Sequence, residues 1–316
     1  MPRAPGEERQ DFLVDVAKLY YEQGRSQAEI ARQFRISRSL VSNLLKLCRE
    51  QGIVEIRSND PRSRAVRLQR LLCERFGLAQ ARVVPSGGDA RAEVGRAAAR
   101  LLEPMLADDL LIGISWGTTL HELVSNVRPA GVKGVQVVQL HGGLGAGDPA
   151  IDGFGLAQKL AAVLSGSYRT IPAPIIVQSD ELRDLLMQEP RIRETLALGA
   201  RSHIALFGIG SNLPAISSLV RSGILSQKES QGLVHRDIVG TVCGLHVDAG
   251  GSVASTPFNR RLVGLSPAAI ARIPVRVGVA AGAPKTAAVR AALLGKFVTA
   301  LVVDEAIAER IVAEGG

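Results

Sequence analysis

Apolar residues recur at helical spacing near the start of the chain. In the stretch DFLVDVAKLYYEQG the apolar positions are 12, 13, 16, 19 and 20, and Gly24 follows them. This period predicts an amphipathic helix that ends before the glycine. Ser26 and Glu29 have the spacing of a capping box, so they predict a short helix over residues 27–34.

A second short helix is predicted after the break RIS. Ser37 is its expected N-cap, and the helix runs to about Glu50. Its apolar residues follow the i, i+3, i+4, i+7 pattern of a buried stripe: Val41, Leu44, Leu45 and Cys48. The other side carries short polar groups and cations. With the start of the preceding helix, it supplies the candidate DNA-contacting residues Gln27, Ser37, Arg38, Ser39, Ser42, Asn43 and Lys46.

This polar face suits DNA. Short hydrogen-bonding side chains reach base edges in a major groove, and flanking cations bind phosphates. Two short helices with a tight turn between them therefore predict a helix-turn-helix. The stretch GIVEIR at 52–57 predicts a short strand that closes a wing. The alternative is a helical hairpin used only for packing or dimerisation.

A further helix is predicted between this domain and the remainder of the chain. Its apolar side consists of Val66, Leu68, Leu71, Leu72 and Phe76. The expected organisation is a helix-turn-helix domain at 1–57, a linker helix at 58–80 and a second domain at 81–316. The linker helix is also a candidate contact between subunits.

From residue 81 onward, apolar runs alternate with helical stretches. Strands are expected in ARVVP, DLLIGIS, VQVVQLHGG, SHIALFGIG, VRVGVAAG and FVTALVVD, and helices in AEVGRAAARLLEPML, TTLHELVSNV, GLAQKLAAVL and KTAAVRAALLG. This alternation predicts an α/β domain with a mainly parallel sheet and helices on both faces. Ligands of such folds bind beyond the carboxyl ends of the strands, beside helix N-termini.

Three of the expected strand ends carry groups suited to a ligand. GISWGTT combines a glycine, which permits close backbone approach, with hydroxyls and amides at a helix start, which suit a phosphate. QLHGGLGAG offers a histidine beside flexible glycines, and AAGAPKTAAV places a lysine at the mouth of another helix. Each such turn by itself is more often structural than functional. The prediction of a ligand site therefore rests on the presence of three of them in one sheet. The candidate residues are Gly117, Thr118, Thr119, His141, Gly142 and Lys285.

Composition narrows the class of protein. A chain of 316 residues with 46% apolar residues is long enough for two domains with a large, mainly aliphatic core. The three cysteines form no CxxC pair, which argues against a disulfide framework or zinc site and fits a cytoplasmic protein. No secretion leader or membrane span is expected, and GGLGAG lacks the spacing of a dinucleotide fingerprint. We therefore expect no cofactor and no metal.

Charge is concentrated near the N-terminus. The formal net charge is +8. The segment from Arg32 to Arg49 contains five cations and no acid: Arg32, Arg35, Arg38, Lys46 and Arg49. A positive field at the predicted helix-turn-helix is what phosphate contacts require.

Longer stretches resemble one known family. LYYEQGRSQAEIARQFRISRSLVSNLLKLCREQGIVEIR resembles the N-terminal domain of the SorC family of bacterial sugar-responsive transcription regulators. The segments that resemble the rest of the family, in order, are GISWGTTL, VQLHGGLG, GIGS, LVRSGILSQKE, VCGLHVDAGG and VGVAAGAPKTAAVRAALLGKFVTALVVDEAIA. The resemblance extends from about Leu13 to Ala308.

The resemblance implies a DNA-binding head and an effector domain similar to glucosamine-6-phosphate deaminase and ribose-5-phosphate isomerase. The usual effector is a phosphorylated sugar or related metabolite, and the usual assembly is a tetramer. It implies that Gly117, Thr118 and Thr119 bind the effector phosphate. It also implies that His141 and Gly142 line the pocket and that Lys285 reaches the ligand.

Three positions depart from the family pattern. Arg35 stands where glycine is common, so it strains the turn or adds a phosphate contact. Asn43 stands where arginine is frequent, and asparagine favours adenine edges. Thr241 stands where an acid commonly holds a sugar hydroxyl. It joins the candidate effector-binding residues and predicts a different mode of sugar binding.

The expected function is that of a DNA-binding regulator of a carbohydrate-utilisation operon, gated by a phosphorylated sugar or polyol, and not of an enzyme. The expected partners are double-stranded operator DNA, the effector and further copies of the chain in a dimer or tetramer, with no membrane.

Two alternatives remain. One is a sugar-phosphate isomerase or deaminase with an appended head, which needs a carboxylate base. The candidate acids are Asp148, Asp152, Asp248 and Asp304. The other is a protein that coats DNA without sequence preference.

Overall fold

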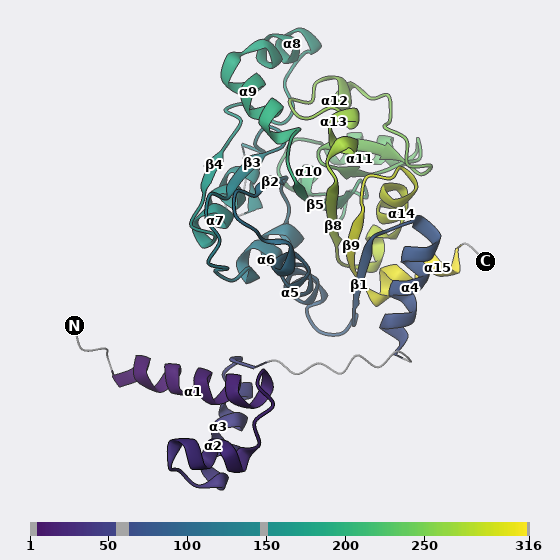
Figure 1. Ribbon diagram of the computed structural model, residues 1–316. Coiled ribbons are helices and arrows are strands. Elements are labelled where there is room, and N and C mark those ends of the chain that lie inside the picture. The colour runs from purple at the N-terminus through teal and green to yellow at the C-terminus, as the bar shows by residue number, and fades with distance from the viewer. Residues whose placement is uncertain (1–4, 55–62, 146–150, 315–316) are drawn as a thin grey trace. The chain divides into compact units, whose positions relative to one another are not determined.

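The computed structural model describes residues 5–54, 63–145 and 151–314, with the backbone alone for residues 5–9. The chain divides into two compact units, Met1–Asp60 and Pro61–Gly316 (Figure 1). Among the described residues, no helix has both the length and the apolar character needed to cross a membrane.

In its described residues, the first unit has three helices, α1 (Pro5–Tyr21), α2 (Gln27–Phe34) and α3 (Arg38–Glu50). The predicted capping box is confirmed: the Ser26 hydroxyl accepts the Glu29 amide, and the Glu29 carboxylate accepts the Ser26 amide. The predicted stripe of α3 is buried at Val41, Leu45 and Cys48, with Leu44 half-buried at its edge. Val41 and Leu45 pack with Val16 of α1 and with Ile30 and Ala31 of α2 in a small core.

The turn between α2 and α3 contains a strained residue. Arg35 ends α2 with φ 54° and ψ 42°, in the left-handed region that favours glycine. Its amide and that of Ile36 bond back to the last carbonyls of α2, as in a Schellman motif. After α3, residues 51–54 form a turn without a strand, and residues 55–57 of the predicted wing lie outside the described residues.

The second unit is built on a nine-stranded sheet. Parallel strands lie in the order β1-β9-β8-β5-β2-β3-β4, and β6 and β7 form an antiparallel hairpin beside β5. The prediction of a mainly parallel α/β sheet is confirmed. The strands are β1 Gln80–Val84, β2 Leu111–Ile114, β3 Gln136–Gln139, β4 Ser167–Arg169, β5 Ile204–Ser211, β6 Ile238–Val242, β7 Leu245–Asp248, β8 Val275–Ala280 and β9 Ala300–Asp304.

Helices cover both faces of this sheet (Figure 1). Side chains of α5, α6 and α7 share one apolar cluster with the sheet, and those of α4, α9, α14 and α15 share the other. Alternate residues of β5 serve opposite faces, so Leu206 enters the first cluster and Phe207 the second. The principal helices are α4 Arg64–Phe76, α5 Ala90–Leu102, α6 Thr118–Asn126, α7 Gly153–Val163, α8 Asp180–Gln188, α9 Pro190–Gly199, α10 Ser218–Arg221, α11 Gln227–Val234, α12 Pro257–Arg260, α13 Pro267–Arg272, α14 Thr286–Leu294 and α15 Glu305–Ala313.

The helix expected as a linker is packed into the second unit. Leu68, Leu72 and Phe76 of α4 are buried in the second cluster, against β1 and α15. The Arg75 guanidinium donates to the carbonyl oxygens of Ile311 and Val312. These contacts tie the start of this unit to its C-terminal helix.

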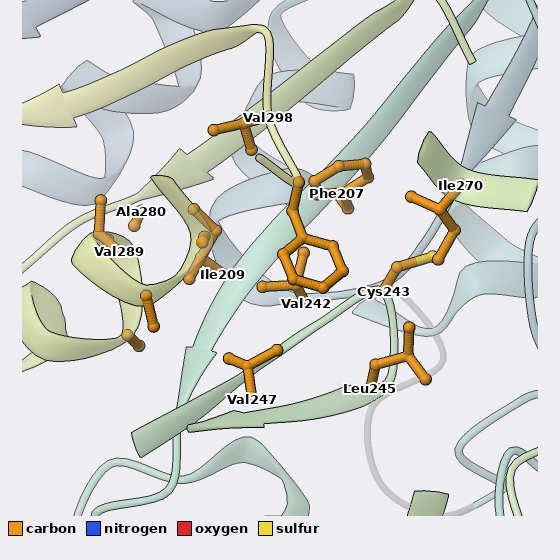
Figure 2. Close-up of a cluster of buried hydrophobic side chains, with 14 of the residues drawn as sticks. Phe207, Ile209, Val242, Cys243, Leu245, Val247, Ile270, Ala280, Val289 and Val298 are labelled. Atoms are coloured by element: carbon orange, nitrogen blue, oxygen red, sulfur yellow. The ribbon is translucent and has the colours of Figure 1, made fainter. Parts of the chain in front are cut away.

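The β6–β7 hairpin adds a layer over the end of β5. Val242 and Leu245 lie close to Phe207 and Ile209 of β5 in the same apolar cluster (Figure 2). The turn consists of Cys243 and Gly244, with φ of 50° and 81°. Positive φ at both central residues is the requirement of a type I′ hairpin turn. The hairpin thereby places Gly244 and Thr241 near the carboxyl edge of the sheet.

Arg35→Gly should stabilise the head by about 1 kcal/mol, because glycine adopts the left-handed conformation without the steric cost that an L side chain meets there. Hydrogen exchange of the α2 and α3 amides in the full-length protein measures this. Arg35→Ala removes the charge but keeps the strain, so it should give no such gain. Equal protection in both variants would contradict the assignment of strain to this turn.

Candidate functional site

The exposed face of α3 carries the residues expected to contact DNA. Ser37 lies at the helix start and accepts the amide of Leu40 at 3.1 Å. Gln27, at the start of α2, is half-buried. The remaining residues are exposed and lie together on α3: Arg38, Ser39, Ser42, Asn43 and Lys46.

One residue of this face was not expected. Leu40 is an apolar residue with 43% of its surface exposed, in the first turn of α3. An exposed aliphatic side chain among polar ones suits contact with a thymine methyl group. The sequence pattern could have shown it, because Leu40 falls outside the buried stripe that Val41 begins.

The second unit has a pocket at the carboxyl edge of its sheet. Its inner hollow measures about 20 Å³ and its outer hollow about 280 Å³, and both are lined by Thr118, Thr119 and Lys285. None of the described residues that line either hollow is acidic. The inner hollow is lined by Ser115, Trp116, Gly117, Thr118, Thr119, Gly208, Ile209, Gly210, Ser218, Thr241, Gly244 and Lys285.

Two helices begin at this pocket without a side-chain cap. Gly117 precedes α6 with φ 135°, and Lys285 precedes α14; neither helix start has a capping hydrogen bond from a side chain. The Thr119 hydroxyl is buried and has no hydrogen-bond partner among the described residues. The uncapped start of α6 and this hydroxyl together form a site for an anion.

Lys285 supplies the positive charge of this site. Burial, together with the neighbouring charges of Arg221 and Arg91 and against the opposing effect of Asp304, lowers the pKa of Lys285 to about 8. Arg91 and Arg221 are exposed and line the outer hollow. The sequence did not predict these arginines, because they come from the first turn of α5 and the end of α10, which only the fold brings together.

Asp304 holds the loop before Lys285 in place. It is buried at the end of β9, and its carboxylate accepts the amides of Gly282, at 2.6 Å, and Ile307, at 3.1 Å. The Ser86 hydroxyl is a further donor to it. These bonds commit the carboxylate to the backbone, so Asp304 has a structural role in this arrangement.

Thr241 lies on β6 opposite Gly210 of β5 and lines the inner hollow. A Cβ at position 210 would come within 2.5 Å of the Thr241 hydroxyl. Glycine at 210 therefore makes the room that Thr241 needs. The structure thus brings Thr118, Thr119, Thr241, Gly117 and Lys285 together around one pocket.

His141 and Gly142 lie behind the pocket and do not line it. His141 is completely buried, and its Nε2 lies 2.6 Å from the Ser115 hydroxyl. A Cβ at Gly142 would meet the carbonyl oxygens of Ala173 and Pro174 at 2.5 and 2.4 Å. The chain of residues 173–174 and the hairpin turn thus cover this strand end. The expectation of direct contact is corrected: His141 reaches the pocket through Ser115.

The other candidate acids also lie away from the pocket lining. Asp152 caps α7 and accepts the amide of Leu144 at 3.1 Å, and Asp248 accepts that of Ser252 at 2.9 Å. Asp148 lies outside the described residues. In the described part of the chain, no group of three His, Cys, Asp or Glu side chains could hold a metal ion.

A helix-turn-helix head followed by an α/β domain with a pocket at its carboxyl edge defines a ligand-responsive transcriptional regulator. Residues 60–313 match the family described as "Putative sugar-binding domain", and residues 19–65 match the MarR family. The chain belongs to the SorC family of sugar-responsive transcriptional regulators.

Relatives share both parts of the chain. A deoxyribonucleoside regulator of Bacillus subtilis is 30% identical over 309 residues, which cover 96% of this chain and 98% of that protein. The sorbitol operon regulator of Klebsiella pneumoniae is 30% identical over 305 residues, covering 94% and 96%. The crystal structure of full-length sorbitol operon regulator SorC from Klebsiella pneumoniae has a TM-score of 0.81 and 29% identity, covering 96% of this chain and 98% of that one.

Sulfate affinity of the pocket should fall about tenfold between pH 7 and pH 9. Sulfate keeps its charge over this range, whereas Lys285 loses its proton as the pH rises through its pKa of about 8. Calorimetric titration of the full-length protein at several pH values measures this. Lys285→Arg keeps its charge throughout, so its affinity should stay constant. A wild-type affinity that is also constant would contradict the role given to Lys285.

Proposed function

We propose that α3 reads operator DNA and that the pocket between α6 and α14 binds the phosphate of a sugar or polyol effector. The observation that carries the effector site is the uncapped start of α6, with the unpartnered Thr119 hydroxyl beside Lys285. Amides, a hydroxyl and an ammonium group can each donate a hydrogen bond, and the oxygens of a phosphate accept them. The relatives named for a deoxyribonucleoside and for sorbitol support a hydroxylated carbon compound as the remainder of the effector.

An effector that enters the inner hollow must move part of the pocket wall. The inner hollow of about 20 Å³ has room for a water molecule and not for a sugar carbon chain. An effector that places its hydroxyls there selects a more open arrangement of the hairpin turn or of α10, each of which contributes to the lining. This difference between arrangements is the physical basis for gating.

The regulator acts as a homo-oligomer in the cytoplasm in this proposal. Operator half-sites related by two-fold symmetry require two heads. A dimer or a tetramer meets this requirement. The separate folding of the head, with its own small core, fits a reader that the effector unit can reposition.

The arrangement supports binding more than catalysis. An isomerase or deaminase needs a carboxylate base near the substrate, and among the described residues none lines the pocket. Ser115 and His141 resemble a nucleophile and its base. However, burial holds the pKa of His141 at about 4, and its second nitrogen faces the Gly142 carbonyl oxygen where a triad has a carboxylate. We therefore propose that the chain is not an enzyme.

Arg38→Ala and Asn43→Ala should weaken operator binding without unfolding the protein. Loss of a bidentate base contact from Asn43 costs about 1–3 kcal/mol and relaxes base preference at one position. Fluorescence anisotropy with DNA selected from a random library measures affinity. Lys18→Ala, an exposed cation of α1, is the matched control and should keep wild-type affinity. Full affinity in both α3 variants would refute the recognition helix, and equal affinity for every sequence would favour non-specific coating.

Thr118→Val and Lys285→Ala should keep operator binding and lose its response to effector. A thermal-shift screen of phosphorylated sugars and polyols against their unphosphorylated forms identifies the compound. In the wild type, this compound should change operator affinity about 5–150-fold. Lys228→Ala, on exposed α11, should respond like the wild type. A retained response in both pocket variants would refute the site, and conversion of the compound into a product would favour the enzyme.

A further inference from the structure

Ser115 links the inner hollow to a buried histidine. It follows β2 directly, lines the hollow and has 1% of its surface exposed. Its hydroxyl lies 2.6 Å from Nε2 of His141, which is completely buried on the neighbouring strand end. Nδ1 of the same ring lies 2.8 Å from the carbonyl oxygen of Gly142. Both ring nitrogens therefore have one partner each.

The Gly142 carbonyl decides which nitrogen carries the proton. A carbonyl oxygen can only accept, so Nδ1 must carry a hydrogen. A neutral imidazole then has a bare Nε2, which can only accept. Full burial favours the neutral ring, and it lowers the pKa of His141 to about 4. The hydrogen of the 2.6 Å contact must therefore come from the Ser115 hydroxyl.

This direction fixes what Ser115 presents to the hollow. A hydroxyl has one hydrogen and two lone pairs, and the hydrogen is committed to His141. The Cys243 thiol, also buried, lies beside Ser115, and burial raises its pKa to about 12, so the thiol keeps its hydrogen. The Ser115 hydroxyl therefore has only lone pairs left for a ligand.

We propose that Ser115 is an acceptor subsite at the inner end of the pocket, which takes a hydroxyl group of the effector and rejects an anionic group there. The inference rests on the proposed effector function and adds an orientation to it. The phosphate binds at Thr118, Thr119 and Lys285, where the protein offers donors. The hydroxylated end points inward to Ser115, where the protein offers an acceptor.

The orientation defines the class of effector. A compound with one phosphate and a neutral hydroxyl at its far end satisfies both ends of the pocket. A compound with a carboxylate or a second phosphate at the far end places its acceptor oxygens against the Ser115 oxygen, which is also an acceptor. Such a compound should bind more weakly. Arg91 and Arg221 cannot relieve this conflict, because they line only the outer hollow.

The first experiment needs no effector. Long-range proton–nitrogen correlation NMR of the full-length protein with ¹⁵N-labelled histidine shows which ring nitrogen of His141 is protonated. His141→Gln assigns the signal. We expect a protonated Nδ1 and a bare Nε2, with the Nε2 signal shifted in Ser115→Ala through loss of its donor. A protonated Nε2 would overturn the inference, whatever binds in the pocket.

The second experiment compares ligands in pairs. Calorimetry measures the affinity of the best sugar or polyol phosphate and of its single-deoxy analogues. In the wild type, loss of the hydroxyl that reaches Ser115 should weaken binding about tenfold, the effect of one hydrogen bond. In Ser115→Ala the same pair should bind equally. Ser115→Thr keeps the hydroxyl, so the parent compound should still bind more tightly than its deoxy analogue. This variant tests the role of the hydroxyl even if the alanine variant fails to fold.

The outcomes separate the two hypotheses. Inorganic phosphate should bind equally to the wild type and to Ser115→Ala, because it contacts the helix starts alone. If every deoxy analogue keeps its penalty in Ser115→Ala, the acceptor subsite is wrong, although the effector site stands. If phosphate and all phosphorylated compounds fail to bind the wild type, the effector site itself is wrong, and the NMR result still decides the state of Ser115.

Discussion

In a parallel α/β sheet, every helix that follows a strand begins at the same edge, and this constraint produces the pocket proposed as the effector site. At most of these starts a side chain caps the helix, as Asp89 caps α5, Asp152 caps α7 and Asp304 caps α15. At α6 and α14 no side chain does so. The amides left over are the donors that a ligand can take. The pocket is therefore defined by helix starts that no side chain caps, more than by any particular side chain that lines it.

Among the described residues, no acidic side chain lines the pocket at these two helix starts. The Asp304 carboxylate acts on the charge of Lys285, and it is bound to the amides of Gly282 and Ile307. Lys285 is buried enough to lose much of its preference for the charged form, so a bound anion both stabilises and is stabilised by its ammonium group. In the proposed function the head binds DNA differently, since the cations of α3 are exposed and act in water. One chain would thus recognise phosphate twice, by partly buried donors in one unit and by solvated charges in the other.

Sequence patterns predicted the elements well where each element is periodic by itself. The caps at Ser26 and Ser37 fixed the head helices, and the apolar runs fixed β1, β2, β3, β5, β8 and β9. Contacts between distant segments escaped prediction. Arg91 and Arg221 reach the pocket only through the strand order, and His141 is removed from it by the segment at 173–174 and the hairpin turn. The short exposed strand β4 lacks any apolar period, because all three of its residues face solvent.

Uncapped helix starts also bear on the lifetime of the protein in the cell. A buried threonine hydroxyl without a partner among the described residues makes the free form less stable, and a bound effector would supply the missing partner. Proteases remove proteins in proportion to the fraction that opens. If the pocket binds the effector as proposed, the free regulator is degraded faster than the loaded one. A cell that takes up the effector would both switch this regulator and keep more of it, so the sugar would set the size of the pool that senses it.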